Sequence, residues 1–243
     1  MTCCAGVARI LRFNWPWYAA AVAATALGLA ALAWWIPAGP WWAAATGLLL
    51  LGDGWLVLSL AVSHVIYDRS AIARGGWLDG VQAASVAILH AGHDEASAHV
   101  ARRLPAAVRH AFDICDPAGA VSPSLRRARA EARTASAVVP SGCIPLPDAA
   151  IELAVVAFAA HEIRDHGLRV AFFRELARLI GLQGRILVVE HQRDAWNLLA
   201  YGPGFLHFLP RSAWLRTFAE AGLRLAGERT STPWVRTFEL RAD

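Results

Sequence analysis

The chain has 243 residues, of which 56% are hydrophobic, and a formal net charge of +4 in which every positive side chain is arginine. No arginine cluster is dense enough, or interleaved enough with aromatic residues, to indicate nucleic-acid binding. Hydrophobicity is uneven along the chain, which indicates a membrane segment followed by a soluble domain rather than one large domain.

Two nearly uncharged stretches open the chain. Residues 15–36 carry no charge, and residues 41–65 carry only Asp53. At about 1.5 Å per residue, each stretch covers a hydrocarbon core of about 30 Å. A secretory signal peptide has a shorter apolar core and no second span, so residues 1–68 are predicted to form a hairpin of two transmembrane helices. Asp53 either pairs across the hairpin, marks a dimer contact or is tolerated among its apolar neighbours.

The residues that flank the spans predict an orientation. Arg9 and Arg12 precede the first span, Arg69 and Arg74 follow the second, and the turn between the spans is uncharged. The positive-inside rule therefore predicts an inner (cytoplasmic) membrane protein with both termini and the soluble domain in the cytoplasm. Tryptophans gather at the predicted span ends, as interfacial aromatic residues do: Trp15, Trp17, Trp34, Trp35, Trp41 and Trp42.

The soluble part begins after a short linker, predicted at residues 69–76, and is expected to form one domain over residues 77–243. A short helix is predicted near 77–84. Strands at 86–89, 107–114 and 136–140 then alternate with helices at 95–104 and 122–132. Alternation of this kind is typical of a parallel sheet covered by helices.

The segment 144–191 carries the strongest pattern. A near-continuous apolar strand is predicted at 151–158, a helix capped by Asp165 and stopped by Gly181 follows, and a second buried strand occupies 185–190. A helix at 212–221 and strands at 224–230 and 234–241, paired as an antiparallel hairpin, close the chain. The predicted fold class is therefore α/β, a doubly wound, mostly parallel seven-stranded sheet with an antiparallel C-terminal hairpin, preceded by two transmembrane helices.

An apolar insertion, Ala195 to Trp214, follows the fifth strand and is interrupted by Gly202, Pro203 and Gly204. It is either a lid over a substrate cleft or a buried helical pair that completes the core.

Three motifs resemble a known family: IPLPD before the fourth strand, AAHEIRD after it, and FFRELARLIGLQGRILVVEH into the fifth strand. Together with AWLRTFAEAGL before the final hairpin, they resemble the class I methyltransferases that use S-adenosylmethionine, over about residues 77–243. The resemblance implies a Rossmann-like fold and S-adenosylmethionine as the cofactor. A nicotinamide-dependent Rossmann enzyme fits less well, because the chain has no G-x-G-x-x-G turn.

The first half departs from the family pattern, because VAILHAGHDEAS keeps a single glycine where the family has three. Ile88 stands in place of an acidic residue, and His90 and Asp94 stand in place of glycines. Asp94 and Glu95 either accept from the methionine amino group or simply cap a helix. The cofactor-binding residues that the resemblance implies are His90, Ala91, Gly92, Asp94, Asp113 or Asp116, Ser141, Gly142 and Ala159.

His161 is the predicted catalytic residue, because it follows the fourth strand on the side where the methyl group would lie. A histidine there can remove the proton of an acceptor hydroxyl, so O-methylation is favoured. Glu162 and His191 are further catalytic candidates, and each of the three also has a plausible structural role. No metal is predicted, because the spacing in EHQRD does not match a specific ligand set.

The sequence thus predicts a membrane-anchored methyltransferase that acts on a lipophilic small molecule. The alternative is a catalytically silent methyltransferase-like scaffold in a membrane biosynthetic complex, which the incomplete glycine turn favours.

Overall fold

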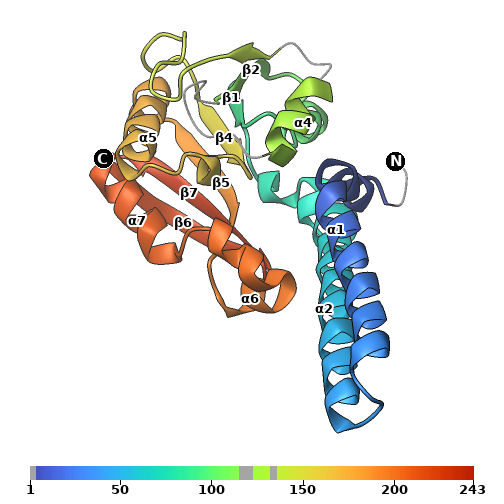
Figure 1. The fold of residues 1–243 in the computed structure, drawn as a ribbon. Coiled ribbons are helices and arrows are strands. Elements are labelled where there is room, and N and C mark those ends of the chain that lie inside the picture. The colour runs from blue at the N-terminus through green and yellow to red at the C-terminus, as the bar shows by residue number, and fades with distance from the viewer. Residues whose placement is uncertain (1–3, 115–122, 132–135) are drawn as a thin grey trace.

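The computed structural model describes residues 4–114, 123–131 and 136–243 and consists of a helical hairpin and an α/β domain (Figure 1). The hairpin comprises α1 (Ala5–Trp35) and α2 (Pro40–His64), which run side by side away from the domain. The two hairpin helices are long and apolar enough to cross a membrane, by length and composition.

Small residues and one polar pair hold the hairpin together. Gly28 packs against Leu49, where a Cβ atom would approach the leucine to 3.0 Å. Three residues away, the Thr25 hydroxyl donates to the Asp53 carboxylate at 3.1 Å. Asp53 therefore pairs across the hairpin, which satisfies a polar group that would be costly in lipid.

The end of the hairpin nearest the domain is closed by Asp68. Its carboxylate accepts from the backbone N–H groups of Gly6 at 2.6 Å and Val7 at 3.1 Å, in the first turn of α1. These N–H groups have no partner within α1, so Asp68 caps one helix from the end of the other. Although partial burial opposes it, these hydrogen bonds hold the pKa of Asp68 below its ordinary value.

Helix α2 passes into the domain through three short helical turns, η1 (Val65–Arg69), η2 (Ile72–Arg74) and η3 (Gly76–Leu78). The segment predicted as a linker is thus folded, and Ile66, Ile72 and Trp77 are buried in the domain core. The prediction of a helix at 77–84 is wrong. Gly80 adopts a φ of 77°, a left-handed conformation that ends helical structure directly after η3.

The domain is built on a seven-stranded sheet with the order β3-β2-β1-β4-β5-β7-β6. The first five strands are parallel, and β7 pairs antiparallel with both β5 and β6. The predicted fold class is therefore confirmed. The strands are β1 (Ser85–His90), β2 (Val108–Asp113), β3 (Ala137–Val138), β4 (Leu153–Ala157), β5 (Arg185–His191), β6 (Leu223–Thr232) and β7 (Val235–Ala242).

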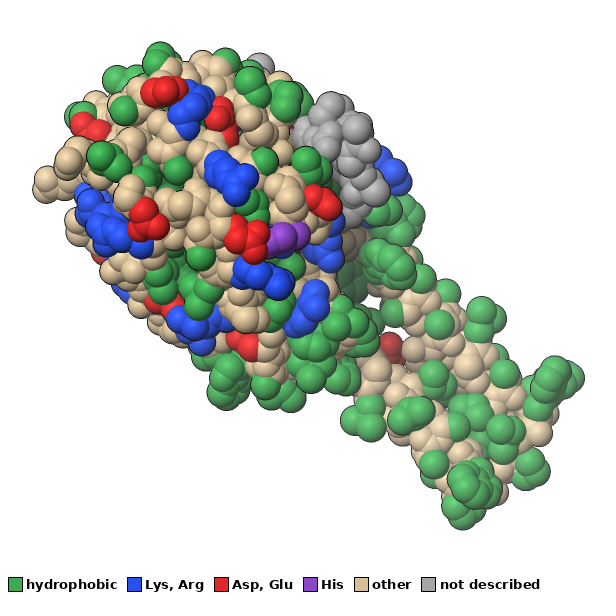
Figure 2. Space-filling model, turned by 90° about the vertical axis from the view of Figure 1, so that its left-hand side faces the viewer, with side chains coloured by type: hydrophobic (Ala, Val, Ile, Leu, Met, Phe, Trp, Pro, Cys, Tyr) green, Lys and Arg blue, Asp and Glu red, His purple; other side chains and the backbone are tan. Residues whose placement is uncertain are grey.

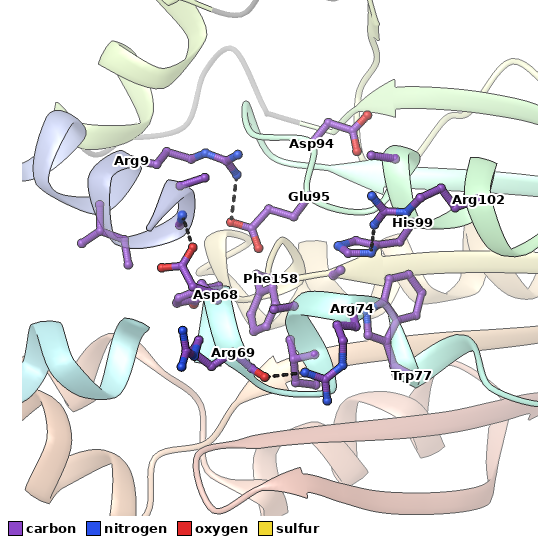
Figure 3. Close-up of a pocket in the computed structure, with 18 residues that line it drawn as sticks. Arg9, Asp68, Arg69, Arg74, Trp77, Asp94, Glu95, His99, Arg102 and Phe158 are labelled. Carbon is purple, nitrogen blue, oxygen red and sulfur yellow. Dashed lines mark hydrogen bonds and ion pairs between the residues drawn. The ribbon is translucent and has the colours of Figure 1, made fainter. Parts of the chain in front are cut away.

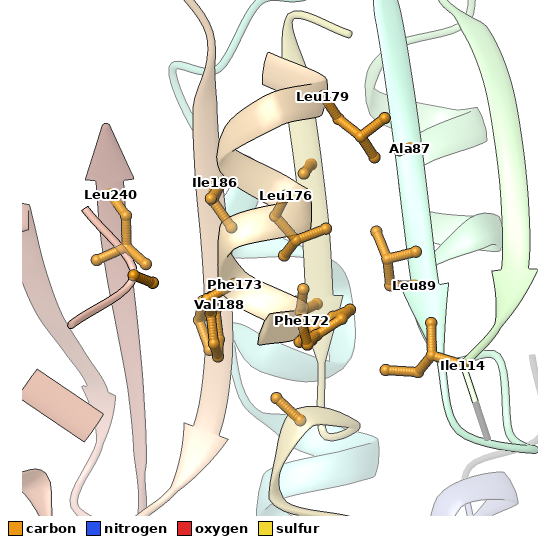
Figure 4. Packing of buried hydrophobic residues seen from close by; sticks show 14 of the residues in the cluster. Ala87, Leu89, Ile114, Phe172, Phe173, Leu176, Leu179, Ile186, Val188 and Leu240 are labelled. Carbon is orange, nitrogen blue, oxygen red and sulfur yellow. The ribbon is translucent and has the colours of Figure 1, made fainter. Parts of the chain in front are cut away.

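Helices cover both faces of this sheet, and the side chains of the buried strands β1, β4 and β5 alternate between two cores. Ala87 and Leu89 of β1 enter the first core, under α5 (His166–Ile180) and α7 (Arg211–Glu220) (Figure 4). Val86 and Ile88 enter the second core, together with η1, η3 and the end of α2. The remaining helices are α3 (Ser97–Arg103), α4 (Pro123–Glu131), η4 (Ala160–Glu162), α6 (Ala195–Tyr201) and η5 (Gly202–His207).

Helix α5 begins and ends where the sequence predicts. The Asp165 carboxylate accepts from the Leu168 N–H at 2.8 Å, and Gly181 follows the last turn. Phe172, Leu176 and Leu179 are fully buried against the sheet. Burial of such side chains stabilises a domain by about 2 kcal/mol each, so this helix contributes strongly to the first core.

Candidate functional site

A cavity of about 480 Å³, here called the β1–β2 cavity, lies where these two strands end. Four of the residues predicted to bind the cofactor line it, namely His90, Gly92, Asp94 and Asp113. They meet because parallel strands present their carboxyl ends at one edge of a sheet. The volume is in the range of small-molecule sites.

Asp113, at the end of β2, organises this cavity. Its carboxylate accepts from the Gly92 N–H at 3.0 Å and from two nitrogens of Arg129, on α4, at 2.7 and 3.1 Å. Gly92 has a φ of 66°, and a Cβ atom there would lie 2.7 Å from Leu125. Only glycine therefore fits this turn without strain.

His90 is a polar group without a partner in the same cavity. Its side chain is 5% exposed, and neither ring nitrogen has a hydrogen-bond partner among the residues that the structure describes. Burial lowers its pKa, although Asp94 and Asp113 oppose the shift. A buried imidazole with two open nitrogens is costly unless a ligand or water satisfies it.

The other described residues predicted to bind the cofactor do not line this cavity. Of the described residues that line it, none is Ala91, Ser141, Gly142 or Ala159, and Asp116 lies outside the described residues. Asp94 caps α3, since its carboxylate accepts from the N–H groups of Ala96 and Ser97 at 3.1 and 2.8 Å. The capping alternative for Asp94 therefore has direct geometric support.

A second cavity of about 400 Å³, the hairpin-side cavity, lies between the start of α1, η1, η2 and the end of β4 (Figure 3). Glu95 points into it and faces Arg9 of α1, 3.9 Å away. Burial raises the pKa of Glu95 to about 7, although the Arg9 guanidinium opposes the shift. Asp94 lines both cavities, so they adjoin each other at this loop.

His161 and Glu190 form a buried pair at the ends of β4 and β5. His161 Nδ1 lies 2.8 Å from the Glu190 carboxylate, which also faces the His161 N–H at 3.3 Å. The Glu190 side chain is fully buried, and His161 is 8% exposed. Burial lowers the pKa of His161, but Glu190 and then Glu162 outweigh this effect, so the pKa is raised. Because a carboxylate can only accept, we assign the proton to Nδ1, which leaves Nε2 as the acceptor in neutral His161.

Nε2 of His161 lies 3.6 Å from the Glu162 carboxylate, and the His161 ring contacts the segment after β5. The His207 ring, on η5, packs edge-on against it with centroids 5.1 Å apart, and His207 Nε2 lies 3.3 Å from Glu162. One possible ligand atom from each of His161, Glu162 and His207 lies within 4.8 Å of the other two. Among the described residues, these three side chains therefore have a spacing that could hold a cation. His207 is 45 residues from Glu162 in the sequence, so no motif with metal-ligand spacing links the two residues. The expectation that the protein binds no metal remains a prediction.

His191, the last residue of β5, has partners on both ring nitrogens. Nδ1 donates to Asn197 Oδ1 and to the Trp234 carbonyl, both at 3.1 Å, and Nε2 accepts from the Tyr67 hydroxyl at 2.8 Å. Burial lowers its pKa to about 4. The ring also stacks on Phe208, with centroids 4.7 Å apart. This geometry supports a structural role for His191, as the hydrogen-bonded centre of an aromatic cluster.

Sequence reasoning missed several residues that shape the site. Tyr67 follows the second span and gave no signal for a contact with β5. Phe158 packs edge-on against Tyr67 and has a φ of 53°. A positive φ is rare for a bulky side chain, so nothing in the sequence predicts it. Arg129 lies on a helix rich in arginine, so its pairing with Asp113 is visible only in three dimensions.

No protein-family model matches the chain, and no curated protein matches it in sequence. Solved structures do match its fold. Mitomycin 7-O-methyltransferase MmcR is 18% identical with a TM-score of 0.57, over 100% of this chain and 74% of that one. A SAM-dependent methyltransferase from Aquifex aeolicus is 14% identical with a TM-score of 0.51, over 65% of this chain and 82% of that one. A putative methyltransferase in complex with the Haloferax volcanii Trm112 activator is 16% identical with a TM-score of 0.52, over 78% of this chain and 96% of that one. The chain therefore has the fold of the S-adenosylmethionine-dependent methyltransferases of class I.

Proposed function

We propose that this protein is a membrane-anchored methyltransferase that uses S-adenosylmethionine to methylate a hydroxyl group of a lipophilic small molecule. The buried His161–Glu190 pair carries the proposal, because it places an activated imidazole at the carboxyl edge of the sheet. The strand order and the likeness to methyltransferase structures support the reaction class.

The β1–β2 cavity is the proposed cofactor site. The Asp113 carboxylate, at the end of β2, would accept from the ribose hydroxyls, and the open nitrogens of His90 would find a polar partner in the ligand. Gly92 lets the backbone approach the ligand closely. When bound, the cofactor supplies a methyl group on a positively charged sulfur.

The protein's own chemical contribution is the removal of one proton. Nε2 of His161 would take the proton of the acceptor hydroxyl. The bound cofactor would supply the methyl group, whose bond to sulfur breaks as its bond to the hydroxyl oxygen forms, so that the neutral thioether leaves. Glu190 holds the ring in the required tautomer and stabilises the imidazolium that results. General-base catalysis of this kind contributes about 10² to 10⁴ in rate, and alignment of the two reactants contributes more.

The apolar surroundings support a lipophilic acceptor. Phe208 lies between His161 and His191, with ring centroids 6.1 and 4.7 Å away. Phe158 and Tyr67 complete an aromatic wall next to the end of the hairpin. An acceptor dissolved in the bilayer would meet this wall at the end of α2, on the cytoplasmic side that the arginine distribution predicts.

The experiment uses the full chain in detergent. We expect calorimetry to detect S-adenosylhomocysteine binding, and His161→Gln to keep that binding while methylation of a lipid extract falls by at least 100-fold. His166→Gln is the matched control, because His166 also pairs with a carboxylate at 2.8 Å, that of Glu220, but on the surface. Mass spectrometry of the extract would identify the acceptor by the mass of one added methyl group. No binding at millimolar ligand would contradict the proposal.

The Arg129–Asp113 ion pair favours the second candidate, a silent scaffold, because it occupies the carboxylate proposed for the ribose. Under this alternative, the wild-type chain binds no cofactor and Arg129→Gln does not restore binding. Copurification of a partner enzyme with the cofactor-free protein would support it.

A further inference from the structure

The segment after β5 carries an exposed apolar surface. We call α6 and η5, residues 195–207, the lid. Four large apolar side chains of the lid are 40 to 59% exposed: Trp196, Leu198, Leu199 and Leu206. Figure 2 shows hydrophobic side chains gathered at the end of the domain from which the hairpin projects. A patch of this kind on a protein surface is typical of a contact with another apolar phase.

The lid is attached directly to the second hairpin helix. Trp55 of α2 donates its indole N–H to the Leu199 carbonyl at 2.8 Å. The same indole ring packs on Gly202, where a Cβ atom would lie 3.5 Å from it. The lid therefore lies at the level of Trp55, inside the second apolar stretch, rather than above the end of the hairpin.

Contacts between α1 and α2 show how deep Trp55 would lie in the hydrocarbon. Gly28 lies opposite Leu49 and Thr25 opposite Asp53, so Trp17 of α1 is level with about residue 60 of α2. Trp17 and Trp35 are 18 residues apart, about 27 Å of helix, which matches the hydrocarbon thickness that interfacial tryptophans delimit. Trp55 is five residues below the level of Trp17, about 8 Å into the hydrocarbon.

We propose that the lid lies within the near leaflet of the bilayer, with its apolar side chains among the acyl chains. This inference rests on the membrane hairpin of the proposed function. A depth of about 8 Å is typical of amphipathic segments that lie in the membrane interface. An acceptor dissolved in the bilayer would then approach His161 from the side of Phe208, which packs against its ring, by lateral diffusion and without passing through water.

The hydrogen bonds of backbone carbonyls at the end of the lid are consistent with a lipid environment. Polar groups of an irregular segment in lipid need partners within the protein. Arg193 donates to the carbonyls of Leu206 and Phe208, both at 2.8 Å, and Arg164 donates to that of His207. These two arginines therefore satisfy the last two carbonyls of the lid, Leu206 and His207, and that of Phe208, which follows it.

The test measures depth with a fluorophore on single cysteines. The four native cysteines are replaced by serine, and Leu199→Cys is labelled with an environment-sensitive NBD dye. The full chain is placed in vesicles of phosphatidylcholine and phosphatidylglycerol that contain doxyl-labelled lipids. Leu182→Cys is the matched control, because Leu182 is 72% exposed in the turn after α5, and Leu48→Cys reports on the hairpin itself.

We expect doxyl lipids to quench the label at position 199 at least threefold more strongly than the label at 182, and most strongly from a shallow doxyl position. Quenching at 48 but not at 199 would overturn the lid proposal and leave the hairpin intact. Absence of quenching at both 48 and 199 would overturn both. Protection of position 199 from lipid and from aqueous iodide alike would show that a second protein chain covers the lid, and would also overturn the proposal.

Discussion

The Tyr67 hydroxyl lies 2.8 Å from Nε2 of His191, and this hydrogen bond joins the end of the hairpin to the end of strand β5. Because His191 uses its other nitrogen for Asn197 and the Trp234 carbonyl, one imidazole connects the hairpin, the lid and the final β-hairpin. The helical hairpin is therefore hydrogen-bonded to the residue at the centre of the aromatic cluster beside His161.

The first prediction concerns this bond. We expect Tyr67→Phe to lower the free energy of unfolding by about 1 to 3 kcal/mol, because it leaves the buried Nε2 of His191 without a donor. Thermal unfolding in detergent measures the change. Tyr201→Phe is the control, since its hydroxyl makes only a 3.5 Å contact with Ser63 and its loss should have little effect. Equal effects of the two substitutions would contradict the assigned hydrogen bond.

The second prediction is a pH dependence of stability. Folding lowers the pKa of His191 from about 6.5 to about 4, so the unfolded chain binds a proton in this interval that the folded chain does not. The stabilisation is complete above pH 6.5 and is lost as the pH falls towards 4. From pH 7 to pH 5 it falls by about 2 kcal/mol, at 1.36 kcal/mol per pH unit.

His191→Gln removes this titration and keeps an acceptor for Tyr67. We expect the unfolding temperature of the wild type to fall by about 4 to 8 °C more than that of the variant between pH 7 and pH 5. Parallel curves for the two proteins would show that His191 does not titrate in this way.

The third prediction concerns the pH dependence of methyl transfer. In the proposed reaction His161 acts as a base only when it is neutral, so we expect activity to fall as the pH falls through its raised pKa. Glu190→Gln removes the largest factor that raises this pKa while burial persists, so we expect the midpoint of the kcat/KM profile to move down by about one unit, with lower kcat. Among the described residues, the other charged or titratable groups that act on His161 include Glu162, Arg164, His191, His207 and Glu95.

Glu220→Gln is the matched control for this profile, because Glu220 pairs with the surface residue His166. Its midpoint should equal that of the wild type. An unchanged midpoint in Glu190→Gln would remove His161 from the role of base.

The fourth prediction concerns the cofactor. Asp113→Asn keeps the shape of the side chain but removes the charge that strengthens its hydrogen bonds to hydroxyl groups. We expect S-adenosylhomocysteine to bind about tenfold more weakly, as measured by calorimetry. Arg129→Gln separates this effect from loss of the ion pair, since it removes the guanidinium from the Asp113 carboxylate and should not weaken binding. Weaker binding in Arg129→Gln alone would place the ligand on Arg129 instead.

The parts of the fold that sequence predicted well depend on local pattern. Helix α5 has its cap at Asp165 and its stop at Gly181, and β4 and β5 are continuous apolar runs, so each needs no distant information. Their order then fixes the sheet, because parallel connections are right-handed and short. Leu168 shows the limit of periodicity, since it has helical spacing with Phe172 but is 48% exposed in the first turn.

The parts that sequence did not predict depend on contacts between distant segments. The sequence shows Glu190 only as the polar last residue of a predicted strand. The pairing of β4 with β5 is what places its carboxylate 2.8 Å from Nδ1 of His161. His207 entered the site through the lid, and Tyr67 through the hairpin. Neither segment has a periodicity that specifies which surface it packs against.

The direct passage of α2 through η1 into the domain core has a consequence for selectivity. Ile66 is fully buried and Asp68 caps α1, so the junction between the domain and its two helices is packed and hydrogen-bonded. In the proposed membrane-anchored enzyme, this junction would hold His161 at one height relative to Trp17 and Trp35. The enzyme would then select acceptors by the depth of their hydroxyl group in the bilayer. A longer or shorter homologue would place that hydroxyl at a depth that His161 does not reach. The hairpin would act as a molecular ruler.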